Sequence, residues 1–331
     1  MALLKVGSGA WLDMTWLNIG NLAYGEMTFA NAGRMTQEFD DGAVTEFFGN
    51  FSYTNQGVLS GGTLTGMEDY LDGQFLFGFS GVSVPVAKFI GWIETGDTYG
   101  AEAFMFAGND QMIGNEGNDA LLGFAGNDSI DGGGGDDALA GNEGNDTIYG
   151  GHGDDYIVGL EGNDVIEAGW GEDDINGNQG SDTVRGGDDG DWVRGGKDND
   201  VVYGDAGDDY HLNGNLGDDY VFGGTGRDTC YGGQGNDVLY GQEGADLLSG
   251  DLGDDTLVGG DGADRFLFGA GGGADLVTDF STAQGDKLLL AAGTTYNTSV
   301  ADGNTIVGLG GGATITLQGV TLGGSDWIVF V

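Results

Sequence analysis

The chain has 331 residues, with 54 acidic against 9 basic side chains and a formal net charge of -45 at pH 7. A charge of this sign and size repels phosphate, which excludes nucleic acid as a partner and disfavours an anionic membrane surface. The single cysteine, Cys230, excludes an intrachain disulfide, and no apolar run reaches the length of a membrane span.

Residues 1–104 contain none of the repeats described below. Aromatic residues alternate with other residues from Phe47 to Tyr53 and from Phe75 to Phe79. A period of two residues is typical of β-strands. We therefore predict a small β-rich N-terminal module with its own core.

Residues 105–267 are organised by an aspartate that recurs every nine residues. Only the step from Asp209 to Asp219 is ten residues long, which predicts one inserted residue near Asn213. A fixed period of this kind indicates a repeat architecture. The recurring aspartates are Asp110, Asp119, Asp128, Asp137, Asp146, Asp155, Asp164, Asp173, Asp182, Asp191, Asp200, Asp209, Asp219, Asp228, Asp237, Asp246, Asp255 and Asp264.

Around each aspartate the frame reads G-G/N-x-G-x-D-x-U-x, where U is apolar; GGQGNDVLY at residues 232–240 is a close copy. The first six residues favour a turn, because glycine adopts positive φ at little cost. The last three residues can form a strand that points U inward. Two repeats would then complete one coil around a thin apolar core. His211 stands at a U position, so we expect a bulge there with Leu212 entering the core instead.

This pattern resembles the RTX (repeats-in-toxin) family of calcium-binding nonapeptide repeats. The resemblance implies a parallel β-roll that carries several Ca²⁺ ions. The residues agree, because one apolar residue in nine is too little to offset the lost backbone entropy. Aspartates 18 residues apart would lie on the same edge of the roll, where Ca²⁺ can bind carboxylate and carbonyl oxygens.

We therefore expect all eighteen aspartates to be metal ligands, in at most about 16 sites. Without calcium we expect the roll to be unfolded. Asp189 and Asp198 replace the glycine at the fourth position of their repeats. Aspartate tolerates positive φ better than most residues, so these turns can survive, but we expect the weakest calcium binding there.

Residues 268–331 differ again from the repeats. Residues 274–280 (ADLVTDF), 285–290 (GDKLLL), 314–320 (TITLQGV) and 326–331 (DWIVFV) resemble the C-terminal type I secretion domain of serralysin-type and other RTX exports. The resemblance implies export by type I secretion machinery from a Gram-negative-type bacterium, to the medium or the cell surface. A simpler reading makes residues 328–331 a last edge strand. Both readings can hold, because the signal is read while the chain is unfolded.

The outward positions of alternate repeats carry several aromatic residues on one face: Tyr203, Tyr220, Phe222 and Tyr240. A contiguous apolar face indicates contact with a partner. Three partners fit this face: the chain's own C-terminal module folded back, a second copy of the chain, or a cell-surface polymer.

Together these features predict an all-β protein: a calcium-loaded parallel β-roll between a β-rich N-terminal module and a β-rich C-terminal secretion domain. We expect a secreted, non-enzymatic structural, surface-layer or adhesion component. No zinc-protease motif, Gly-x-Ser-x-Gly elbow or phosphate-binding loop occurs. Acidic pairs in residues 1–104 leave one alternative, a small secreted hydrolase or lyase with catalysis in that module.

Overall fold

The computed structural model describes residues 3–6, 26–31, 34–38, 43–53, 59–71, 74–85, 107–269 and 271–331. Side chains before residue 107, and with them the expected core of the N-terminal module, lie outside this description. Every described element is a β-strand, so the all-β prediction is confirmed. The strands belong to two compact units, residues 1–152 and 153–331, and each unit is taken by itself below.

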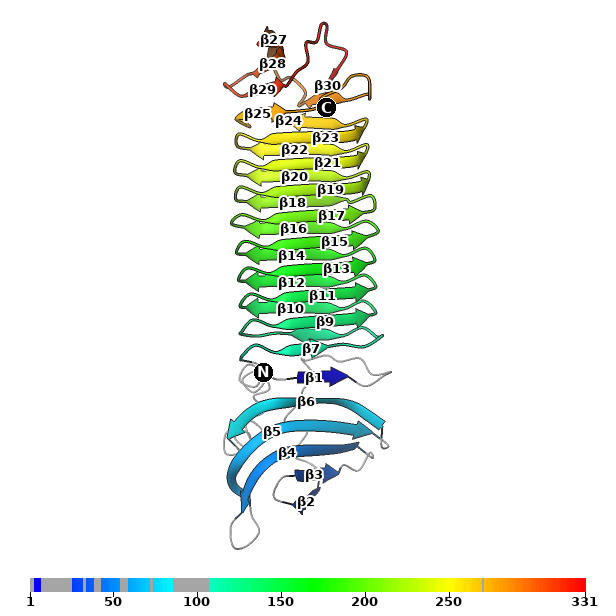
Figure 1. Cartoon of the computed structure of the whole chain (residues 1–331), viewed down its shortest axis with the longest axis vertical. Coiled ribbons are helices and arrows are strands. Elements are labelled where there is room, and N and C mark those ends of the chain that lie inside the picture. Colours follow the sequence, from blue (N-terminus) through cyan, green and yellow to red (C-terminus); the bar gives the residue numbers. More distant parts are fainter. Residues whose placement is uncertain are drawn as a thin grey trace. The chain divides into compact units, whose positions relative to one another are not determined.

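The first unit begins with an antiparallel sheet. Its strands pair in chain order: β2 (Glu26–Asn31), β3 (Arg34–Glu38), β4 (Ala43–Tyr53), β5 (Leu59–Leu71) and β6 (Gln74–Pro85). The strands predicted from alternating aromatic residues are β4 and β6. β1 (Leu3–Val6) pairs antiparallel with β6 and parallel with β7 (Gln111–Ile113), so it joins this sheet to the first repeat (Figure 1).

The repeats of the first unit form parallel pairs between alternate strands. Ile130 of β9 is in register with Met112 of β7 and with Ile148 of β11, at intervals of 18 residues. In the other sheet, Leu139 of β10 is in register with Leu121 of β8. Two repeats therefore make one coil, as predicted. The strands are β8 (Ala120–Leu122), β9 (Ser129–Gly134), β10 (Ala138–Glu143) and β11 (Thr147–His152).

The second unit continues the same pattern as a parallel β-solenoid, with strands stacked alternately in two sheets (Figure 1). Sheet A, as we name it, contains β13 (Val165–Trp170), β15 (Thr183–Asp188), β17 (Val201–Ala206), β19 (Tyr220–Gly226), β21 (Val238–Gly244) and β23 (Thr256–Gly262). Sheet B contains β12 (Tyr156–Glu161), β14 (Asp174–Gln179), β16 (Trp192–Lys197), β18 (His211–Leu216), β20 (Thr229–Gln234), β22 (Leu247–Leu252) and β24 (Arg265–Phe268).

The U residues form the apolar core of each unit. Those from Met112 to Phe266 are at most 1% exposed. Cys230 occupies one of these positions, and burial raises the pKa of its thiol well above the usual range, so it is a small buried hydrophobic residue and not a nucleophile. Besides U, most buried residues of the described coil up to Arg265 are small or lie in turns, so the core is about one side chain wide.

The inserted residue is Tyr210 and not a residue near Asn213. In sheet B, Leu212 is in register with Val193 and Cys230, and Asn213 is in register with Arg194. The extra residue therefore precedes β18, where Tyr210 is 60% exposed. Leu212 is completely buried, which confirms that it replaces His211 in the core.

The turns that contain Asp189 and Asp198 keep the general path of the coil. Their φ angles are 77° and 72°, in the left-handed region that aspartate tolerates. Glycines at the same place in the second unit have wider angles, for example 128° at Gly171. The bond from the Gly171 N–H to the Asp188 carbonyl is 3.4 Å, against 2.8 Å for the bond from Gly153 to Trp170. The turn therefore survives in a loosened form.

The C-terminal residues extend both sheets. β25 (Ala274–Val277) pairs with β23, and β26 (Lys287–Leu290) pairs with β24. The antiparallel strands β27 (Tyr296–Ala301), β28 (Asn304–Leu309) and β29 (Thr314–Leu317) continue from β25, and β30 (Ile328–Phe330) pairs with β26. The predicted edge strand at residues 328–331 is thus confirmed. The domain boundaries at residues 104 and 267 stay predictions.

The position of the insertion can be tested by deletion. Deleting Tyr210 restores the nine-residue spacing and keeps the register of β18, so we expect the calcium-loaded melting temperature to change by no more than about 3 °C. Deleting Asn213 shifts every later residue of β18 to the opposite face, so we expect a fall of more than about 5 °C. Equal effects of the two deletions would contradict the assignment.

Candidate metal centre

All eighteen recurring aspartates are buried in the turns, with at most 5% of the residue exposed. In each unit they precede strands of one sheet or of the other, so they form two columns on opposite edges of the coil. Burying a charged group is costly unless it is paired or binds a metal. A cation site is therefore expected along these columns.

In most of these aspartates one carboxylate oxygen accepts a hydrogen bond from the neighbouring coil. The N–H of Asp173 donates to Oδ1 of Asp191 at 2.9 Å, and the N–H of Asp237 donates to Oδ1 of Asp255 at 2.9 Å. The preceding residue bonds in the opposite direction: the N–H of Asp254 donates to Oδ1 of Asn236 at 3.0 Å. These bonds fix both the stacking of the turns and the orientation of each carboxylate.

The other oxygen, Oδ2, is buried without a hydrogen-bond donor in a large subset of these aspartates. Among the described residues this holds for Asp128, Asp173, Asp182, Asp191, Asp200, Asp209, Asp219, Asp228, Asp237, Asp246, Asp255 and Asp264. A buried carboxylate oxygen that lacks a donor costs free energy. The repetition of the same deficit along both columns indicates a missing positive partner.

Backbone oxygens converge on the same points. A Cβ added to Gly223 would lie 2.6 Å from Oδ2 of Asp228 and 2.6 Å from the carbonyl oxygen of Gly241. The first position of the described repeats is glycine except at Ala168, and Gly241 likewise has no side chain where the Asp246 carboxylate and the Gly259 carbonyl meet. No group of three or more His, Cys, Asp or Glu residues gathers in the described part of the chain, so carbonyls would supply the other ligands. Carboxylates with carbonyls are a donor set that fits Ca²⁺.

The raised pKa values of the column aspartates also indicate that their negative charge lacks a positive partner. Burial raises the pKa of Asp173 to about 7 and that of Asp191 to about 8, from an ordinary 3.8. The backbone N–H bond opposes this rise, and the charges of neighbouring aspartates add to it. A carboxyl group that is a tenfold weaker acid costs about 1.4 kcal/mol more to ionise, so the ionised columns need a counter-ion.

Asp189 and Asp198 add charge to these columns. The charge of Asp189 contributes to the raised pKa of Asp173 and Asp191, and that of Asp198 contributes at Asp182 and Asp200. Weakest calcium binding at these two turns stays a prediction.

Two aspartates that the nine-residue count missed continue the columns. Oδ1 of Asp275 accepts the N–H of Asp255 at 3.2 Å, and Oδ1 of Asp286 accepts the N–H of Asp264 at 3.1 Å. Both are buried, and burial raises the pKa of Asp275 to about 7. Their intervals are 20 and 22 residues instead of 18, which hides them from a strict count. Both aspartates keep the D-x-U pattern, Asp275 with Val277 and Asp286 with Leu288, and this pattern could have revealed them in the sequence.

The family description "RTX calcium-binding nonapeptide repeat (4 copies)" matches the chain at residues 106–139, 132–166, 153–184, 185–210, 211–239 and 240–277. These matches cover more than half of the chain. Comparison with curated proteins gives no match. Among the residues that the structure describes, none forms a helix long and apolar enough to cross a bilayer.

Solved structures that show similarity include the following two. The AlgE6R3 subunit from the Azotobacter vinelandii mannuronan C5-epimerase is 30% identical, covering 34% of this chain and 77% of that chain, with a TM-score of 0.28. The extracellular lipase LipA from Serratia marcescens is 13% identical, covering 99% and 85% respectively, with a TM-score of 0.24. Similarity at this level carries no argument about activity.

The raised pKa values predict a pH dependence of folding and of metal binding. In the calcium-free protein, the stability that these carboxyl groups contribute is present below pH 3.8 and lost as pH rises through about 6 to 8. We therefore expect β-structure without calcium at pH near 4 and its loss at pH near 8. Protons compete with the cation, so the calcium midpoint should rise as pH falls from about 8 to 6. A midpoint independent of pH over this range, measured by circular dichroism, would contradict the assignment.

Proposed function

The chain belongs to the family of RTX calcium-binding nonapeptide repeats, and on that premise we propose that it is a secreted protein whose repeats fold when Ca²⁺ binds outside the cell. We propose it as a structural, surface-layer or adhesion component. The observation that carries this proposal is the pair of columns of buried carboxylates, many of which have an Oδ2 atom without a donor. The ligands would be the eighteen recurring aspartates, joined by Asp275 and Asp286 and by turn carbonyls.

Bound Ca²⁺ would supply positive charge and complete the coordination of oxygens that the fold leaves without donors. The chain's own contribution is positional. The Oδ1 bonds orient each carboxylate, and the side-chain-free first glycines keep the meeting point of carboxylate and carbonyl open. The thin apolar core then needs to contribute only part of the stability.

The same dependence on Ca²⁺ gives a rationale for export. In a compartment with little calcium, the charged columns would keep the chain unfolded and able to pass a type I secretion channel. Outside, calcium binds only the folded state and shifts the equilibrium towards it by mass action. Residues 268–331 are our candidate for the export signal.

Calcium-dependent folding is tested by circular dichroism of the full chain. We expect little β-structure near pH 7.5 in a chelator and a cooperative gain of β-structure in millimolar Ca²⁺, with magnesium at the same concentration as the control cation. Identical spectra with chelator and with Ca²⁺ would overturn the proposal.

The aromatic face of sheet A supports self-association more than binding to a polymer. Tyr203 stacks on Phe222 with ring centroids 4.8 Å apart, and Phe222 stacks on Tyr240 at 5.0 Å. The guanidinium of Arg185 lies 3.8 Å above the Tyr203 ring and covers the end of this column. These ring faces are therefore occupied by one another. Tyr220, in the next row, remains 49% exposed, while the C-terminal strands extend the sheets.

We propose that a second copy of the chain covers Tyr220. Changing Tyr220 to Ser should lower the molecular mass measured by light scattering in calcium and leave the melting temperature nearly unchanged. Changing Phe222 to Ser should instead lower the melting temperature, because it breaks the stacked column. Tyr149→Ser, at an exposed tyrosine of the first unit, is the matched control. A monomeric wild-type protein in calcium would refute this contact.

No observation favours the alternative of a hydrolase or lyase in residues 1–104. It stays open to a substrate panel on the full chain.

A further inference from the structure

The outward face of sheet B carries a second group of aromatic and polar side chains, which we name the sheet B patch: Tyr156, Asp174, Asn176, Trp192, Arg194 and His211. Tyr156, Asp174, Trp192 and His211 follow one another in register on β12, β14, β16 and β18. Asn176 and Arg194 occupy the neighbouring row of β14 and β16. The patch therefore runs along the stacking direction of the coils.

The rings of this patch differ in orientation from the stacked column of sheet A. Trp192 and His211 have centroids 4.9 Å apart at an angle of 46°, and His211 and Tyr231 lie 5.0 Å apart at 41°. Tilted rings leave part of their faces uncovered by one another. Tyr156 is 52% exposed and Trp192 is 49% exposed. Tyr156 and Trp192 of sheet B thus offer more aromatic surface to solvent than the half-buried column of sheet A.

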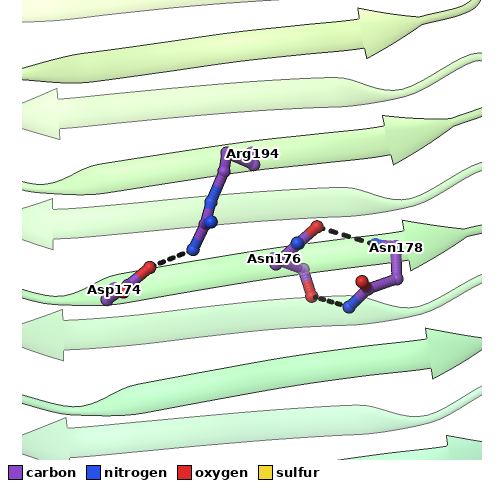
Figure 2. A network of polar contacts seen from close by, with 4 residues as sticks. All are labelled: Asp174, Asn176, Asn178 and Arg194. Atoms are coloured by element: carbon purple, nitrogen blue, oxygen red, sulfur yellow. Dashed lines mark hydrogen bonds and ion pairs between the residues drawn. The ribbon is translucent and has the colours of Figure 1, made fainter.

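Planar polar groups lie between and beside these rings. Figure 2 shows Arg194 reaching across to Asp174, with which it forms an ion pair, and Asn176 next to them on the same face. The Nε of Arg194 is buried without an acceptor within the described residues. The amide of Asn213 lies 3.4 Å from Nε2 of His211. The patch therefore presents both donors and acceptors in fixed positions.

The spacing suits an extended polymer. Tyr156 and Trp192 are separated by one strand, which places them roughly 9.5 Å apart at the usual strand spacing. This separation is comparable to the length of a disaccharide unit in an extended glycan. Asp174, in register between them, can reach the hydroxyl groups of a sugar chain that lies across both rings.

We propose that the sheet B patch binds a neutral, extended polysaccharide. Sugar rings would lie against Tyr156 and Trp192, and their hydroxyl groups, which both donate and accept, would bond to Asp174, Asn176 and Arg194. The chain has a net charge of -45, and about 16 bound Ca²⁺ ions would still leave it negative, which disfavours an anionic polymer. An apolar protein surface would instead bury the Asp174–Arg194 ion pair away from water, at a desolvation cost that sugar hydroxyl groups avoid. This proposal goes beyond the proposed function and does not require that the chain self-associates.

The test is affinity electrophoresis of the full chain in calcium, in gels that contain soluble neutral polysaccharides: a mixed-linkage β-glucan, hydroxyethylcellulose, xylan or dextran. We expect retardation by at least one of them. The variants Trp192→Ala and Tyr156→Ala should each bind about tenfold more weakly, and Arg194→Gln should also bind more weakly. Tyr149→Ala removes an exposed tyrosine of β11, which lies outside the sheet B patch, and should bind like the wild type.

Each variant is first checked for the calcium-dependent circular dichroism of the wild type, so that loss of binding is not loss of folding. If Trp192→Ala does not fold, Tyr156→Ala and Arg194→Gln decide the question. No retardation of folded wild type by any neutral polysaccharide would overturn the proposal. It would also fail if only an anionic polysaccharide binds, or if the variants change the molecular mass and not the retardation. Failure of calcium-dependent folding would instead count against the proposed function.

Discussion

The fold depends on the different roles of the two carboxylate oxygens of the turn aspartates. Oδ1 accepts a backbone N–H from the neighbouring coil, as Asp255 does from Asp237, and this bond holds successive turns together. Oδ2 is left beside a carbonyl oxygen with no donor, as at Asp228. The coil is thus stacked by an arrangement that concentrates negative charge inside it. Without a cation the same contacts that order the turns also oppose their assembly, because burial raises the pKa of these carboxyl groups.

Much of this arrangement could be read from the sequence, because a strict repeat makes one residue's environment common to all its equivalents. The period placed the U residues in the core and the aspartates in the turns. It could show that one residue is added between Asp209 and Asp219, but only strand pairing shows that the residue is Tyr210. Asp275 and Asp286 were missed because longer loops precede them, although the backbone returns each to its column. The regular spacing thus predicted the turn aspartates of the nine-residue repeats, but not those that follow loops of a different length.

The two sheets show why side-chain orientation resists prediction. From the sequence we expect an aromatic outward face on one sheet only, but Tyr156, Trp192 and Tyr231 give sheet B outward aromatic residues as well. In sheet A the rings at the third strand position align directly over one another and stack, so their faces are consumed within the chain. In sheet B the rings of Trp192, His211 and Tyr231 come from both rows and tilt. Which faces remain available follows from this offset between rows and not from residue type.

The two edges of the second unit are not equally fastened. On the edge of Asp219, Asp237 and Asp255, the residue before each aspartate also bonds to the next coil, through Asp218, Asn236 and Asp254. On the other edge Asp154 and Asp208 accept such bonds, but the equivalent positions Gly190, Arg227, Ala245 and Ala263 have no side-chain acceptor oxygen. Along most of the first edge, two side chains per turn therefore accept a hydrogen bond from the next coil, whereas the other edge mainly has one. Each coil bonds mainly to its neighbours, as in other solenoids. Local separation of neighbouring coils should therefore begin at the edge of Asp228, Asp246 and Asp264, where fewer hydrogen bonds join them.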